Sequence, residues 1–143
     1  MPASTTPLPT DADSFTLVYV PEQHLLVGRW LQPVALAELQ QHYEALLDAA
    51  LANGHCHHWL LDVRRRQLYA ADVVQWFGDV FSPQLPAVLG RPVSIAYFAM
   101  VTQNVASEDP GLLQNMQRGL QQGGYYQYFN YESEALAWLA QQP

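Results

Sequence analysis

Five short apolar or aromatic runs, separated by segments of helical periodicity, set the fold that this chain can adopt. Residues 14–20 and 25–31 are rich in β-forming side chains and are joined by four polar or turn residues, which predicts a β-hairpin. Later runs at residues 59–63, 92–101 and 125–131 each follow a helical segment. Strands that alternate with helices pair in parallel through right-handed crossovers, so we expect an α/β domain. Its mixed sheet should have about five strands, covered by about four helices.

The first helical segment is expected to open at Pro33, where the missing N–H is harmless, and to end at Gly54. Between them, residues 36–50 place leucine, tyrosine and alanine on one face at helical spacing. Gly28 lies inside the second β-like run and indicates either a bulge or a close approach to the backbone.

Three further helical segments follow. A helix is predicted over residues 70–81, with a short helical turn after it that ends at Gly90. Asp109 is expected to cap another helix, since proline comes next. Ser133 is expected to cap the last helix, over residues 134–141.

The charge balance excludes several function classes. The chain has six arginines, no lysine and a formal net charge of −7, so it offers no basic face for nucleic acid or for an anionic membrane surface. No apolar run approaches the roughly 18 residues needed to span a bilayer. Cys56 is the one cysteine and has no disulfide partner within the chain, which favours a cytoplasmic location.

The two ends of the chain differ in composition. Residues 1–13 are rich in proline, threonine, serine and alanine, without the features of a signal peptide, and are interpreted as a disordered tail. Residues 14–143 contain no internal linker or repeat and are expected to form one domain.

The opening hairpin, the short strand ending in Asp62 and the closing segment FNYESEALAWL at 129–139 resemble the STAS domain family. The STAS domain is the fold of bacterial anti-sigma-factor antagonists. The same features of this chain also resemble the wider STAS/SEC14-like group of small bacterial proteins. The resemblance covers roughly residues 14–143. It implies a non-enzymatic regulatory or protein-interaction module. The alternative that it implies is a carrier of a small anionic or lipid-like ligand.

The sequence departs from the family at its regulatory position. In family members that act as phosphorylation switches, a serine or threonine follows the strand-ending aspartate, at a helix N-terminus that favours phosphate. Here Asp62 is followed by valine and three arginines, and no serine or threonine occurs between Leu17 and Phe81. A serine or threonine switch beside Asp62 is therefore chemically impossible in this chain.

Arg64, Arg65 and Arg66 form the most informative polar cluster, because they hold half of the positive charge. They follow a predicted central strand, and ligands of open α/β sheets bind beyond the carboxyl ends of strands. One interpretation is a binding site for an anion or a protein partner, with Asp62 orienting one guanidinium. The other is a solvated loop whose arginines pair with surface carboxylates.

Other candidate chemistry is weaker. His55, Cys56, His57 and His58 are potential zinc ligands, but neighbours on an extended chain point to alternate sides and the sequence names no further ligands. A Gly-x-Ser-x-Gly elbow and a glycine-rich phosphate loop are both absent from the sequence. We therefore expect no metal, no cofactor and no enzymatic activity.

Aromatic side chains are unusually dense for so short a chain. Tyr97, Tyr126 and Tyr128 are candidates for a ligand groove or an interface, although aromatic residues in strands also serve as core. An exposed hairpin edge together with many aromatic residues favours pairing of two copies, so a homodimer is expected.

Overall fold

The computed structural model of the protein describes residues 6–7, 14–65, 71–99 and 125–142. Its six strands form one sheet in the order β1-β2-β3-β4-β5-β6. The strands are β1 (Thr6–Pro7), β2 (Phe15–Val20), β3 (Leu25–Trp30), β4 (His58–Asp62), β5 (Ser94–Phe98) and β6 (Tyr125–Phe129). The α-helices of this part of the chain are α1 (Leu36–Ala52), α2 (Ala71–Trp76), α3 (Leu85–Leu89) and α6 (Glu132–Ala140).

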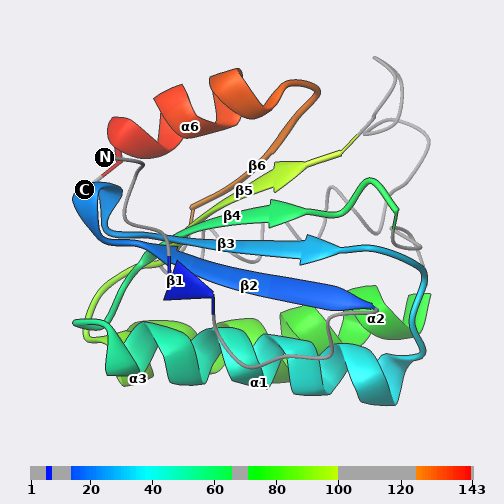
Figure 1. Cartoon of the computed structure of the whole chain (residues 1–143). Coiled ribbons are helices and arrows are strands. Elements are labelled where there is room, and N and C mark those ends of the chain that lie inside the picture. Colours follow the sequence, from blue (N-terminus) through cyan, green and yellow to red (C-terminus); the bar gives the residue numbers. More distant parts are fainter. Residues whose placement is uncertain (1–5, 8–13, 66–70, 100–124, 143) are drawn as a thin grey trace.

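The sheet is mixed, as the sequence predicts. β2 and β3 form an antiparallel hairpin, joined by a short 3-10 turn (Pro21–Gln23), while β3, β4, β5 and β6 run parallel. Helices α1, α2 and α3 lie on one face, and α6 lies on the other (Figure 1). The expected α/β fold with an opening hairpin is confirmed.

Several boundaries differ from the expected ones. Helix α1 begins at Leu36 with Ala35 as its N-cap, so Pro33 precedes the helix instead of opening it. Helix α6 begins at Glu132 after the extended Tyr131, so Ser133 lies inside the helix and is not its cap. In both cases the side chain of the N-cap residue makes no capping hydrogen bond.

The segment predicted as one helix over residues 70–81 is α-helical only in its first part. After α2 it continues as a π-helical turn (Phe77–Phe81) and then as a 3-10 turn (Ser82–Gln84) before α3. Gly90 ends α3 in the left-handed conformation, as expected. The helix predicted after Asp109 lies outside the described residues.

The beginning of the chain contributes to the sheet. Thr6 and Pro7, within the segment interpreted as a disordered tail, form β1 and pair antiparallel with Tyr19 and Val18. Within residues 1–13, the structure describes these two residues, which lie beside β2 in the sheet.

Alternation along the strands divides the core between the two faces. In β4, Trp59 and Leu61 belong to the core under α1, whereas Leu60 belongs to the core under α6. Asp62 follows in the same alternation, so its carboxylate is directed to the α6 face. Asp62 therefore places a charged group on a face of the strand that is otherwise apolar, and charged side chains are rarely buried unless they are paired.

Gly28 shows why the hairpin core is tight. The β2–β3 register runs unbroken from Phe15 opposite Trp30 to Val20 opposite Leu25, so no bulge is present. A Cβ at Gly28 would lie 3.0 Å from the Phe15 ring and 3.2 Å from a Leu61 methyl group. The close approach at this glycine is therefore made by side chains on the α1 face.

We expect Gly28→Ala to lower the free energy of unfolding by about 1–3 kcal/mol, because the added methyl group overpacks this site. Urea unfolding followed by circular dichroism measures the loss. The loss should be smaller in a Phe15→Leu background, where the ring that blocks the methyl group is gone. An equal loss in both backgrounds would contradict this explanation.

Candidate functional site

Parallel strands end at a common edge of the sheet, and that edge carries a charged cluster. Asp62 is the last residue of β4 and is only 4% exposed. The strand register places Arg29 of β3 on one side of it and Phe98 of β5 on the other. The buried carboxylate therefore lies between a cationic and an aromatic neighbour at the carboxyl ends of three strands.

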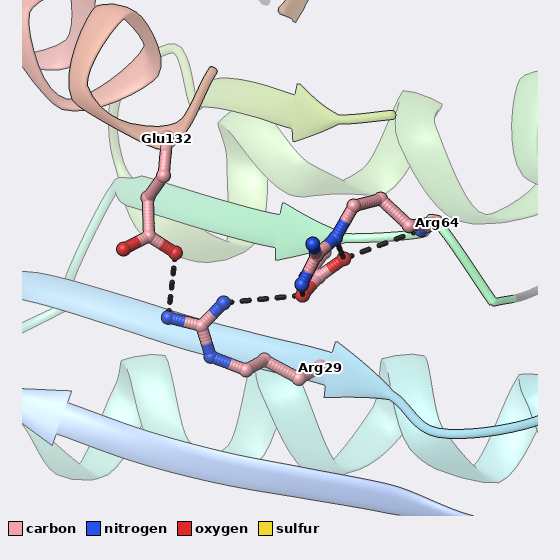
Figure 2. A network of polar contacts seen from close by, with 4 residues as sticks. Arg29, Arg64 and Glu132 are labelled. Atoms are coloured by element: carbon pink, nitrogen blue, oxygen red, sulfur yellow. Dashed lines mark hydrogen bonds and ion pairs between the residues drawn. The ribbon is translucent and has the colours of Figure 1, made fainter. Parts of the chain in front are cut away.

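Two arginines bind the Asp62 carboxylate from different directions (Figure 2). Arg29 places Nη1 3.1 Å from Oδ2. Arg64 donates from Nε to Oδ1 at 2.9 Å and from Nη2 to Oδ2 at 2.8 Å, a two-pronged geometry, while its backbone N–H lies 3.2 Å from Oδ1. The Arg64 guanidinium also lies over the Phe98 ring, 4.2 Å from the ring centre.

Helix α6 joins the cluster through its first residue. Glu132 Oε1 lies 2.7 Å from Arg29 Nη2, so Arg29 bridges two carboxylates (Figure 2). Arg29, Asp62, Arg64 and Glu132, with exposed Arg65 beside them, are called the arginine edge below. The guanidiniums of Arg29 and Arg64 contact the carboxylates of Asp62 and Glu132, and Arg65, which follows Arg64 in the chain, adds one more positive charge in a chain with a net charge of −7.

Protonation equilibria reflect these contacts. Burial alone would raise the pKa of Asp62, but hydrogen bonds and charge from Arg64, with a further hydrogen bond from Arg29, outweigh it and hold that pKa below its usual value. The hydrogen bond to Asp62 in turn raises the pKa of Arg64. Asp62 and Arg64 are therefore both charged at neutral pH.

The outer side of the arginine edge is accessible to solvent. The side chains of Arg29 and Arg64 are 34% and 36% exposed, and that of Glu132 is 39% exposed. A guanidinium has more N–H donors than these contacts use, so both arginines can accept another anionic partner. Arg65 is exposed and forms no ion pair with the part of the chain that the structure describes. Arg66 lies outside the described residues.

Sequence reasoning identified part of this cluster. Asp62 does orient one arginine of the loop, namely Arg64. Arg29 and Glu132 were missed. The available signal for Arg29 was a charged side chain within an apolar strand, and for Glu132 an acidic residue at the start of the last helix.

The three tyrosines proposed for a groove or an interface lie on the α1 side of the sheet. Tyr97 and Tyr126 are buried, and Tyr97 stacks on the half-buried Tyr128 with ring centres 4.8 Å apart. The Tyr126 hydroxyl is 2.6 Å from Ser82 Oγ, and burial raises the Tyr126 pKa to about 12. These contacts tie β5 and β6 to the helical face.

The histidine-rich segment lies at the opposite, amino-terminal edge of the sheet. Cys56 is buried, and burial raises its pKa to about 11, so its thiol stays protonated and unreactive near neutral pH. His57 Nε2 lies 3.3 Å from Arg91 Nη1, and its ring contacts those of His24 and His58. Within the described residues, no three histidine, cysteine or carboxylate side chains are placed to hold a metal ion.

A pocket of about 420 Å³ opens beside this edge, under the end of α6. The side chains that line it include Gln23, Leu25 and His58 from the sheet side, and Ala137, Leu139 and Ala140 from α6. Helix α6 runs back over the sheet (Figure 1). Its first residue, Glu132, contacts Arg29 at the arginine edge, and residues near its other end line this pocket.

Comparison with known proteins gives no relative of this chain: no family model, no curated protein and no solved structure matches it. Among the described residues, no helix combines the length and apolar character needed to cross a bilayer.

Proposed function

We propose that this protein is a non-enzymatic, STAS-like regulatory module that binds an acidic segment of a partner protein at its arginine edge. The observation that carries this proposal is the buried Asp62 carboxylate, which holds the guanidiniums of Arg29 and Arg64 at one edge with their outer sides exposed. A fixed guanidinium loses less conformational freedom on binding than a free one, so this arrangement favours recognition of a further carboxylate.

The openness of the arginine edge favours a protein partner. Its arginines lie on a solvent-exposed edge, each about one-third exposed. Each exposed ion pair contributes only about 0.2–1 kcal/mol, so useful affinity needs several carboxylates bound together. An acidic peptide segment supplies several carboxylates along one chain.

A labelled hexaglutamate peptide tests this proposal at low ionic strength. We expect Arg65→Gln to weaken binding about two- to five-fold, which corresponds to the loss of one exposed ion pair. Arg65 is suited to the test because it lies outside the Asp62 contacts, so the fold should be unchanged. Fluorescence anisotropy measures the affinity.

Arg91→Gln is the matched control, because it removes the same charge from the opposite edge of the sheet. It should change the affinity for hexaglutamate by less than about two-fold. This change is smaller than the one expected from the loss of a strong surface ion pair. Equal weakening by the two substitutions would show that the peptide responds only to total charge and would overturn the proposal.

Self-association and a cytoplasmic location belong to the same proposal. Tyr131 is 64% exposed next to β6, the last strand of the sheet in the described part of the chain, and Tyr125 of that strand is also exposed. Pairing of two copies at this edge would cover both rings and the strand. Sedimentation velocity at tens of micromolar tests the homodimer.

A further inference from the structure

We infer that the acidic segment of the partner binds by exchange: one of its carboxylates replaces the carboxylate of Glu132 on the Arg29 guanidinium. Glu132 is then a competitor within the chain, which occupies the binding position until the partner displaces it. This inference rests on the proposed function, because it names the atoms at which the acidic segment binds and the group that limits its affinity.

The two terminal nitrogens of Arg29 hold carboxylates of very different burial. Nη1 lies 3.1 Å from Oδ2 of Asp62, whose side chain is 6% exposed, and Nη2 lies 2.7 Å from Oε1 of Glu132, whose side chain is 39% exposed. Figure 2 shows Glu132 extending from the start of α6 to Arg29. The contact with Asp62 therefore anchors the guanidinium, whereas the contact with Glu132 is accessible to a carboxylate from outside.

Asp62 is not suited to exchange, because it has further partners. Its carboxylate accepts hydrogen bonds from the Arg64 side chain at 2.9 Å and 2.8 Å, and the Arg64 backbone N–H lies 3.2 Å from it. Glu132 forms an ion pair with Arg29 alone within the part of the chain that the structure describes. When Glu132 leaves, Asp62 still holds Arg29 in place, so the binding position stays formed.

Release of Glu132 from Arg29 costs little. Water solvates both groups once they separate, which is why exposed ion pairs contribute little to stability. Glu132 is also the first residue of α6, where the helix dipole favours a negative charge whether or not Arg29 is bound. A segment that brings several carboxylates to the arginine edge at once therefore outcompetes the single carboxylate of Glu132.

Glu132→Gln tests the exchange with the labelled hexaglutamate peptide and the full-length protein. The substitution keeps the shape of the side chain and removes the competing charge, so the peptide should bind about three- to five-fold more tightly. Fluorescence anisotropy measures the affinity, and circular dichroism confirms that the variant is folded.

Glu134→Gln is the matched control. Glu134 is an exposed acid in the same first turn of α6 and forms no ion pair with the described residues. Both substitutions remove one negative charge from this turn, so the general effect of charge on peptide binding is shared. Glu132→Gln should raise the affinity at least about two-fold more than Glu134→Gln does, and this excess measures the exchange.

The excess should disappear in an Arg29→Gln background, because Glu132 then has no guanidinium to occupy. Equal effects of the two glutamate substitutions, or an excess that persists without Arg29, would overturn the inference. Weaker binding by Glu132→Gln would also overturn it, since Glu132 would then position Arg29 for the partner. The two glutamate substitutions decide the question even if Arg29→Gln does not fold.

The proposed function has its own test in Arg65→Gln and Arg91→Gln, so the two can fail separately. If Arg65→Gln weakens binding more than Arg91→Gln while the two glutamate substitutions act equally, the arginine edge binds the peptide and only the exchange is wrong. If neither the wild type nor Glu132→Gln binds hexaglutamate, both the proposed function and the exchange are wrong.

Discussion

Asp62→Asn is expected to lower the free energy of unfolding by about 1–3 kcal/mol at neutral pH. The substitution keeps the shape of the side chain but removes the charge that two guanidiniums share. Arg29 keeps Glu132 as a partner, whereas Arg64 loses its two-pronged contact. Because both arginines are about one-third exposed, water replaces part of the lost interaction, and the loss should stay below that of a fully buried pair.

The lowered pKa of Asp62 determines how the stability difference between the wild type and Asp62→Asn changes with pH. A carboxyl group whose pKa is lowered by folding stabilises the protein above its unfolded pKa of about 3.9, and this contribution disappears as the pH falls through the lower folded pKa. The difference between the wild type and Asp62→Asn should therefore be constant from about pH 7 to 5 and shrink below about pH 4. Urea midpoints across this range measure it.

Asp48→Asn is the control, since Asp48 is exposed on α1 and its substitution should change stability by less than about 0.5 kcal/mol. If Asp62→Asn unfolded at the same urea concentration as this control, the cluster would be only a surface ion-pair network and would not hold the arginines in place.

The hairpin and the strand that ends at Asp62 could be predicted because each has a local signal. Runs of β-forming residues separated by turn residues identify β2 and β3, and a short apolar run between polar segments identifies β4. The starts of the helices could not be placed in the same way. At Ser133 the cap preference did not decide the boundary: α6 begins one residue earlier, at Glu132, with Ala135 and Leu139 packed against the sheet.

The arginine edge was predicted only where its members are neighbours in sequence. Asp62 and Arg64 are two residues apart, so a turn can join them. Arg29 is 33 residues from Asp62 and reaches it through the parallel register of β3 and β4. Alternation along a strand shows which side chains share a face, but one sequence does not show which residue of the next strand lies opposite. The contact with Glu132 further requires α6 to cross back over the sheet.

Tyr43→Ala is expected to cause a larger loss than any substitution at the arginine edge, about 3–5 kcal/mol. Tyr43 is 1% exposed, and its ring centre lies 5.4 Å from that of Trp30, 5.2 Å from that of Phe77 and 5.1 Å from that of Phe81. The ring therefore joins α1 to β3 and to the π-helical turn. Its removal leaves a cavity between rigid aromatic groups that cannot close around it, so most of the packing energy is lost.

Thermal unfolding followed by circular dichroism should show a midpoint lower by roughly 10 °C or more. Tyr43→Phe keeps the ring and should lose no more than about 1.5 kcal/mol, the contribution of a single hydrogen bond. This second variant keeps the test decisive if Tyr43→Ala fails to fold. Gln41→Ala, an exposed change on the same helix, should be nearly neutral. If Tyr43→Phe were as damaging as Tyr43→Ala, the hydroxyl group and not the packed ring would hold α1 to the sheet.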